Sequence, residues 1–135
     1  MATAKQLHDA VGEFCSLIPS MRAPEWHTHR NVEMEASRAA RKTSWANAAG
    51  IYAFFNGSGE LRYIGRALAG VGLASRVPDH LKPSRRGNPK WDEVLDDENA
   101  TVEVCAVASH DCIWVPSLEL FLCERFTGLV NRRRS

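Results

Sequence analysis

The chain has 135 residues, of which 44% are hydrophobic, so it suits one globular domain with a buried core and is too short for two. Its 17 basic and 16 acidic residues nearly cancel, which excludes a protein that attracts a polyanion through its overall charge. Any affinity for nucleic acid must therefore come from local basic clusters.

The 4 cysteines lie far apart in the sequence and form none of the Cys-x-x-Cys pairs that zinc sites typically use. We interpret them as buried free thiols of a reducing compartment. No apolar run approaches the roughly 20 residues that span a bilayer. The sequence therefore predicts a cytoplasmic protein without a membrane partner.

The first expected element is an amphipathic helix over residues 3–18. Thr3 and Gln6 match the spacing of a capping box at its start, and Pro19 stops it. The apolar residues between these points recur at helical spacing, which indicates that one face packs against a core.

Residues 21–49 are predicted to be largely irregular, with a charged helix over 31–42. We therefore expect residues 1–48 to form an N-terminal helical extension that packs on the core. The core domain itself is expected over residues 49–135.

A β-hairpin is predicted next, with strands over residues 50–56 and 60–66. Asn-Gly-Ser-Gly connects them, and Asn and Gly accept the positive φ angles that tight connections need. The tripeptides Gly-Ile-Tyr and Tyr-Ile-Gly place Tyr52 and Tyr63 on neighbouring antiparallel strands. Taken alone, the two tyrosines are equally well explained as buried strand residues.

Beyond the hairpin we expect a helix over residues 73–81 that contains Pro78, and a short helix over 91–95. Residues 101–107 alternate in the manner of a third strand. The predicted fold class is α/β (α+β), with a small three-stranded antiparallel sheet flanked by helices.

The last expected helix covers residues 116–126, where Pro116 suits the first turn and Gly128 follows as a stop signal. At 100° per residue, Glu119 lies on the flank of its apolar face, whereas Glu124 points to solvent. Carboxylates are rarely buried without a partner, so the position of Glu119 against a packed face indicates a functional or structural role. That apolar face carries Leu118, Leu122, Phe126 and Leu129.

The order and spacing of these features resemble the GIY-YIG nuclease superfamily over about residues 49–131. Members have the two aromatic tripeptides, an arginine on the following helix, often a histidine one turn later, a helical glutamate and a final asparagine. In this chain those positions are Tyr52, Tyr63, Arg76, His80, Glu119 and Asn131. The fragment 72–80 is also similar to the restriction-endonuclease-like branch of the family.

The resemblance implies a divalent-metal-dependent DNA endonuclease that hydrolyses phosphodiester bonds. Glu119 would hold one Mg²⁺, which Mn²⁺ could replace, and Arg76 would contact the scissile phosphate. Asn131 would brace the site.

For the general base, Tyr52 is the preferred candidate, with Tyr63 orienting the water or the phosphate; the two roles are exchangeable at this point. A phenol has a pKa of about 10, so it serves as a base only where nearby cations favour its charged form. Arg76 or His80 could provide that field.

This chain departs from the commonest pattern of the family in two places. Residues 68–72 form a glycine-rich insertion, and Pro78 stands between Arg76 and His80. Because of these two departures, Arg66 is an alternative to Arg76 as the residue that contacts the scissile phosphate. Arg76 is favoured because it is followed by a histidine one turn on.

Two local basic clusters are candidates for binding nucleic acid, although such runs also occur in solvated loops and tails. Their partner would be DNA, with RNA not excluded, and the protein would act as a monomer or a homodimer. The clusters contain Lys82, Arg85, Arg86 and Lys90, and, near the C-terminus, Arg132 and Arg133.

The alternative function is a catalytically inactive GIY-YIG scaffold that binds nucleic acid or a protein. Binding alone does not require Tyr52, Arg76 and Glu119 together. The presence of all three therefore favours the enzyme.

Overall fold

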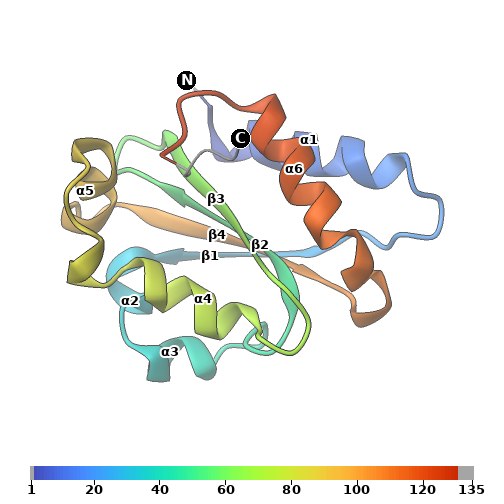
Figure 1. Cartoon of the computed structure of the whole chain (residues 1–135), viewed down its shortest axis with the longest axis horizontal. Coiled ribbons are helices and arrows are strands. Elements are labelled where there is room, and N and C mark those ends of the chain that lie inside the picture. The colour runs from blue at the N-terminus through green and yellow to red at the C-terminus, as the bar shows by residue number, and fades with distance from the viewer. Residues whose placement is uncertain (1, 131–135) are drawn as a thin grey trace.

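The computed structural model describes residues 2–130 and shows an antiparallel sheet between two layers of helices (Figure 1). The sheet has four strands in the order β1-β4-β2-β3, so β1 and β3 are its edges. The strands are β1 (Glu25–Arg30), β2 (Ala49–Phe55), β3 (Leu61–Ala67) and β4 (Thr101–Val107).

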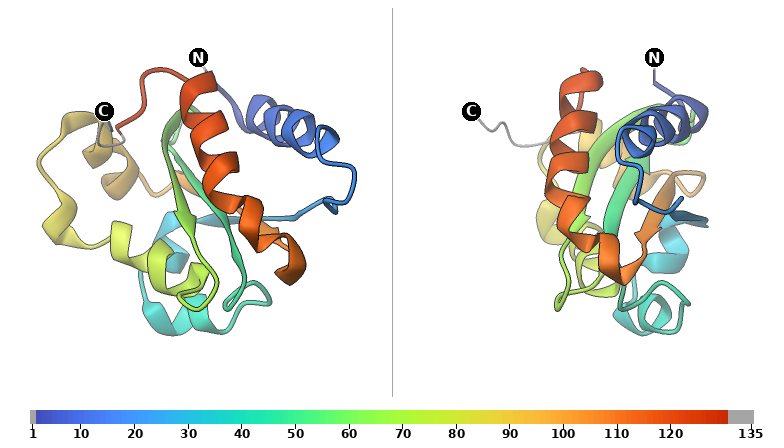
Figure 2. Two further views of the ribbon diagram at one scale, coloured as in Figure 1. Left: turned by 45° about the vertical axis from the view of Figure 1, so that its right-hand side comes forward. Right: turned by 90° about the vertical axis from the view of Figure 1, so that its right-hand side faces the viewer.

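Each face of the sheet buries its own apolar cluster. One cluster joins the sheet to α1 (Ala4–Ser16) and α6 (Val115–Arg125), and the other joins it to α4 (Leu73–His80) and α5 (Pro89–Asp96). Figure 2 shows α6 running alongside β3. The remaining helices are α2 (Asn31–Met34), α3 (Ser37–Arg41) and two short 3₁₀ helices over Pro83–Arg85 and Ser109–Trp114.

The middle strand β2 is buried along its whole length because both faces are covered. Side chains alternate across a strand, so Ile51 and Ala53 face the α1–α6 layer whereas Tyr52 and Phe54 face the α4–α5 layer. The strand therefore lacks the polar-apolar alternation of a half-exposed one.

Most of the predicted elements are confirmed. The hairpin strands lie within one residue of their expected bounds, and the strand over residues 101–107 is β4. Thr3 and Gln6 form the expected capping box of α1. On α6, Leu118 and Leu122 are buried while Glu124 is exposed, as its helical pattern predicted.

The expectation of three strands is wrong. Residues 25–30, predicted to be irregular, form β1 and pair with β4. Thr28 donates a hydrogen bond to Glu103 (2.6 Å), and His8 of α1 lies 2.8 Å from the other oxygen of that buried carboxylate. Because β1 packs against polar groups, its sequence lacks the apolar alternation that would have revealed a strand.

The helix predicted over residues 31–42 is divided into α2 and α3, with Ala36 extended between them. Nothing in the residue types at the break explains it. Pro78 lies inside α4, which ends two residues later. No described helix is long and apolar enough to cross a membrane.

Two glycines allow the hairpin to pack as it does. A Cβ at Gly65 would lie 2.4 Å from the ring of Tyr52, and one at Gly50 would lie 2.0 Å from the carbonyl oxygen of Cys105. Distances below 3.0 Å are sterically forbidden. Gly65 therefore lets the Tyr52 ring lie flat across β3.

Candidate active site

Five of the six residues predicted for the site lie within the described part of the chain, and they gather around edge strand β3. β2 supplies Tyr52, β3 supplies Tyr63, and α6 supplies Glu119 from the opposite layer. α4 supplies Arg76 and His80. The sixth residue, Asn131, lies outside the described residues.

Tyr63 and His80 form a directed pair. His80 Nε2 lies 2.9 Å from the Tyr63 hydroxyl, and Nδ1 lies 3.0 Å from the carbonyl oxygen of Arg76. A carbonyl only accepts, so Nδ1 carries the proton. Burial lowers the pKa of His80, which keeps the ring neutral. Nε2 is therefore the acceptor, and the Tyr63 hydroxyl donates to it.

Tyr52 lies deeper than Tyr63. Its side chain is fully buried, and no residue of the described chain makes a hydrogen bond of normal geometry to its hydroxyl. Burial raises the pKa of Tyr52, and the positive charge of Arg76 opposes that rise. The Arg76 guanidinium is thus close enough to act on this hydroxyl, although without well-aligned contact.

Glu119 is paired with Arg66. Arg66 Nη1 lies 2.8 Å from Glu119 Oε1, and the two side chains are 44% and 21% exposed. The two arginines that the sequence offered as alternative phosphate contacts therefore have different neighbours. Arg76 lies by Tyr52, and Arg66 lies by Glu119. The sequence analysis identified both arginines as candidates but did not predict the ion pair between Arg66 and Glu119.

The two sides of β3 are electrostatically connected. Burial raises the pKa of Tyr63, the negative charge of Glu119 raises it further, and the positive charge of Arg76 lowers it. Any cation that neutralised Glu119 would therefore make the Tyr63 hydroxyl easier to ionise.

Aromatic rings that the sequence analysis did not assign enclose the Tyr63–His80 pair. The ring of Trp91, on α5, lies 5.4 Å from Tyr63 and 5.2 Å from Phe54, measured between centroids. Tyr63, His80 and Trp91 line a hollow of about 350 Å³ together with Arg85. Tyr63 is thus the tyrosine of the site that faces a hollow large enough for a substrate group.

Three of the four basic residues in the cluster predicted over residues 82–90 are engaged in ion pairs with two carboxylates. Asp79 Oδ1 lies 3.0 Å from Lys82 Nζ, and Asp79 Oδ2 lies 2.5 Å from Arg85 Nη2. Hydrogen bonds from these two cations lower the pKa of Asp79 to about 2. Arg86 is paired with Asp96. Lys90 is exposed, and Arg132 and Arg133 lie outside the described residues.

Among residues 2–130 no group of three or more His, Cys, Asp or Glu side chains could hold a metal ion. A site built on one carboxylate is still compatible with Mg²⁺, which usually keeps several waters and shares substrate phosphate oxygens. Glu119 fits that mode, because it lines an open hollow of about 370 Å³ with Arg66, Ser117 and Leu120.

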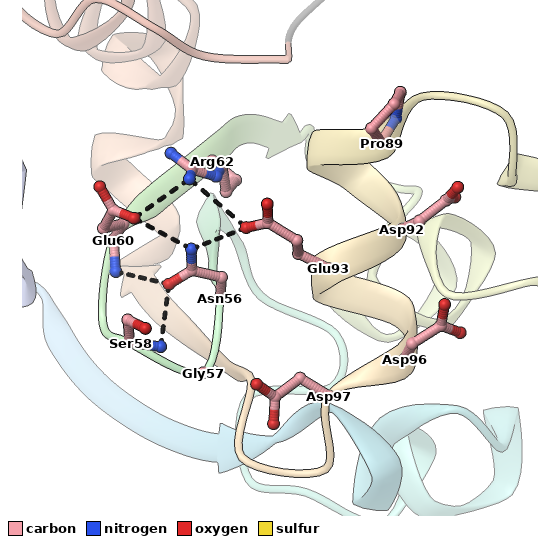
Figure 3. Close-up of a pocket in the computed structure, with 10 residues that line it drawn as sticks. All are labelled: Asn56, Gly57, Ser58, Glu60, Arg62, Pro89, Asp92, Glu93, Asp96 and Asp97. Atoms are coloured by element: carbon pink, nitrogen blue, oxygen red, sulfur yellow. Dashed lines mark hydrogen bonds and ion pairs between the residues drawn. The ribbon is translucent and has the colours of Figure 1, made fainter.

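A larger hollow, of about 900 Å³, lies away from these residues, between the β2–β3 turn and α5 (Figure 3). Asn56 donates to both Glu60 and Glu93, and Arg62 bridges the same two carboxylates. Further carboxylates from Asp92, Asp96 and Asp97 line it. A hollow so rich in negative charge does not suit a polyanion, so a nucleic acid would have to approach β3 elsewhere.

A scan against protein families finds no family that matches this chain, and a search of curated proteins finds no match either. The resemblance to GIY-YIG nucleases thus rests on the chain's own residues.

Proposed function

We propose that this protein is a divalent-metal-dependent endonuclease that hydrolyses phosphodiester bonds in DNA. The observation that carries the proposal is the hydrogen-bond chain from Tyr63 through His80 to the Arg76 carbonyl, beside the unpartnered hydroxyl of Tyr52. Buried polar groups are normally satisfied, so an orphaned hydroxyl next to a guanidinium calls for an explanation. An internal water held between this hydroxyl and the Arg76 guanidinium would provide the missing partner.

The geometry favours Tyr63 rather than Tyr52 as the base. The Tyr63 proton already points at His80 Nε2, whereas Tyr52 has no described acceptor and no exposed surface. As Tyr63 takes a proton from water, its own phenolic proton passes to His80, and the Arg76 carbonyl holds the ring in the required tautomer. Tyr52 then helps to position the Arg76 guanidinium, beside which its hydroxyl lies.

Arg76 and the cation held by Glu119 would stabilise the negative charge of the phosphoryl group. Arg76 offers a planar guanidinium that matches phosphate oxygens, which the ammonium of lysine does not. Glu119 would hold the divalent cation, which supplies Lewis-acid stabilisation of the phosphoryl and leaving oxygens. Glu119 then no longer opposes ionisation of Tyr63.

The inactive binding scaffold is the alternative, and one observation favours it. Lys82, Arg85 and Arg86 are engaged with carboxylates, which weakens the expected basic surface. A scaffold that binds protein needs no such surface.

Incubation of the purified chain with supercoiled plasmid, linear duplex, branched DNA and RNA decides between the two. If the protein is an endonuclease, we expect cleavage of one or more of these substrates in Mg²⁺ and none in chelator. Binding without cleavage in either buffer, at any concentration of protein, leaves the scaffold as the function.

A further inference from the structure

The ion pair between Arg66 and Glu119 joins edge strand β3 to α6. It rests on one nitrogen and one oxygen, 2.8 Å apart, and both side chains retain some exposure. Ion pairs that solvent reaches contribute little to stability and exchange partners easily. The contact is thus weak enough to open when either side chain finds a better partner.

Each member of the pair has a better partner in the proposed reaction. A guanidinium binds phosphate oxygens in a fork that a single carboxylate contact does not use. The carboxylate in turn can hold a divalent cation that keeps several waters and also binds a substrate phosphate oxygen. While Arg66 occupies Oε1 and places its positive charge there, a cation is both displaced and repelled.

We infer that Arg66 binds a phosphate of the nucleic acid and that its departure from Glu119 opens the carboxylate to the divalent cation. This inference rests on the proposed function and adds a coupling to it, in which binding of the backbone phosphate and binding of the cation strengthen one another. Linkage makes the effect reciprocal, so the cation also strengthens the binding of nucleic acid.

The position of the pair favours this role over that of an ion pair that only stabilises the packing of β3 against α6. Arg66 and Glu119 line the same open hollow, with Ser117 and Leu120 beside them. A phosphate and a cation that enter this hollow would therefore meet both members of the pair. The charge of Glu119 reaches Tyr63 on the other side of the strand.

The test measures Mn²⁺ binding to the full chain by calorimetry, with and without a short phosphorothioate DNA duplex, and binding of that duplex in chelator. Arg66→Gln is compared with Arg125→Gln. Arg125 is a matched control because it lies on α6, is 42% exposed and pairs with another carboxylate, Glu13.

For Arg66→Gln we expect Mn²⁺ affinity without DNA to rise on the order of tenfold, within the usual range of coupling between sites. Its affinity for the duplex in chelator should fall, with a salt dependence smaller by about one phosphate contact. The gain in Mn²⁺ affinity that DNA gives the natural protein should become smaller, because only the part contributed by shared phosphate oxygens remains. Arg125→Gln should behave as the natural protein does.

Unchanged Mn²⁺ affinity in folded Arg66→Gln would overturn the inference while leaving the nuclease intact, provided that the natural protein binds Mn²⁺ and cuts DNA. A natural protein that does neither overturns both proposals. Should Arg66→Gln fail to fold, Arg66→Met, which also removes the charge, decides: a raised Mn²⁺ affinity with weaker duplex binding in chelator supports the inference, and natural values for both overturn it.

Discussion

The two sides of β3 differ in how their polar groups are held. On the α4 side, Tyr63 and His80 form a largely buried, neutral hydrogen bond whose direction the Arg76 carbonyl fixes. On the α6 side, Arg66 and Glu119 form an exposed pair of full charges with a single contact. The first arrangement already has its hydrogen bonds in place, whereas the second would have to open for the proposed binding of phosphate and cation.

This difference matches two requirements of the proposed phosphodiester hydrolysis. Proton transfer needs donors and acceptors held within hydrogen-bond distance, and the aromatic rings around Tyr63 provide that rigidity. Binding of cation and phosphate needs charged groups that can leave one partner for another. Substitutions on the α6 side should therefore alter binding, and substitutions on the α4 side should alter the chemical step.

The largest effect is expected from Glu119→Gln. Loss of the carboxylate should reduce cleavage roughly 10²- to 10³-fold or more, because the charge stabilisation that the cation supplies is lost. The fold should survive, since an exposed ion pair contributes about 1 kcal/mol or less. Plasmid cleavage in Mg²⁺ and thermal unfolding measure the two effects. Glu124→Gln, on the exposed face of α6, is the control; equal damage there would refute the role given to Glu119.

The next largest effect distinguishes the two tyrosines. Tyr63→Phe should lose on the order of 10²-fold in rate with DNA binding preserved, the usual scale of general acid–base catalysis. Tyr52→Phe should cost less, because its hydroxyl has no described acceptor for the proton. Single-turnover rates with saturating protein measure both. If Tyr52→Phe is the slower enzyme, Tyr52 is the base, as the resemblance alone had suggested.

The pH dependence of the rate tests His80. The ring accepts the Tyr63 proton only while Nε2 is unprotonated, so the rate should fall as pH drops through the pKa of His80. Burial lowers that pKa, so the fall should begin below the ordinary value of about 6.5. His80→Gln cannot accept the proton as an imidazole does, and this limb of the profile should be missing from it. An acidic limb that persists in His80→Gln would assign it to another group.

The sequence predicted much of this arrangement because the hairpin and the helical spacing fix where backbones run. Tyr52 and Tyr63 had to lie on adjacent strands, and Arg76 and His80 had to share a face of one helix. The flank position of Glu119 likewise follows from its place between Leu118 and Leu122. Backbone periodicity thus placed these five side chains on their elements, whereas their selection as one site came from the resemblance to the GIY-YIG family.

Partners of side chains were not predictable in the same way. Whether Arg66 reaches Glu119 or a phosphate depends on rotamers and on the distance between β3 and α6, which no local pattern encodes. β1 was missed for a related reason: its inner residues face Glu103 and His8, so the apolar alternation that marks a strand is absent. Trp91 likewise gave no sign that its ring would meet Tyr63.

The smallest effect, from Asp79→Asn, concerns binding outside both sides of β3. Asp79 holds Lys82 and Arg85, and its pKa of about 2 lies below the ordinary 3.8, so the charged form is the one that the fold stabilises. That stability is present above pH 3.8 and is lost as pH falls towards 2. Because the group is partly exposed, we expect the substitution to cost about 1 kcal/mol or less near neutral pH. Urea unfolding of both proteins at neutral pH measures this cost.

The same substitution should strengthen binding of duplex DNA in chelator a few-fold, with a steeper salt dependence, because up to two cations become available to phosphates. Asp9→Asn releases Lys5 of α1 from a comparable exposed pair and serves as the control. If Asp79→Asn binds DNA no better than Asp9→Asn does, the basic residues over 82–90 do not contact DNA, and Arg66 of β3 and Arg76 of α4 become the expected contacts.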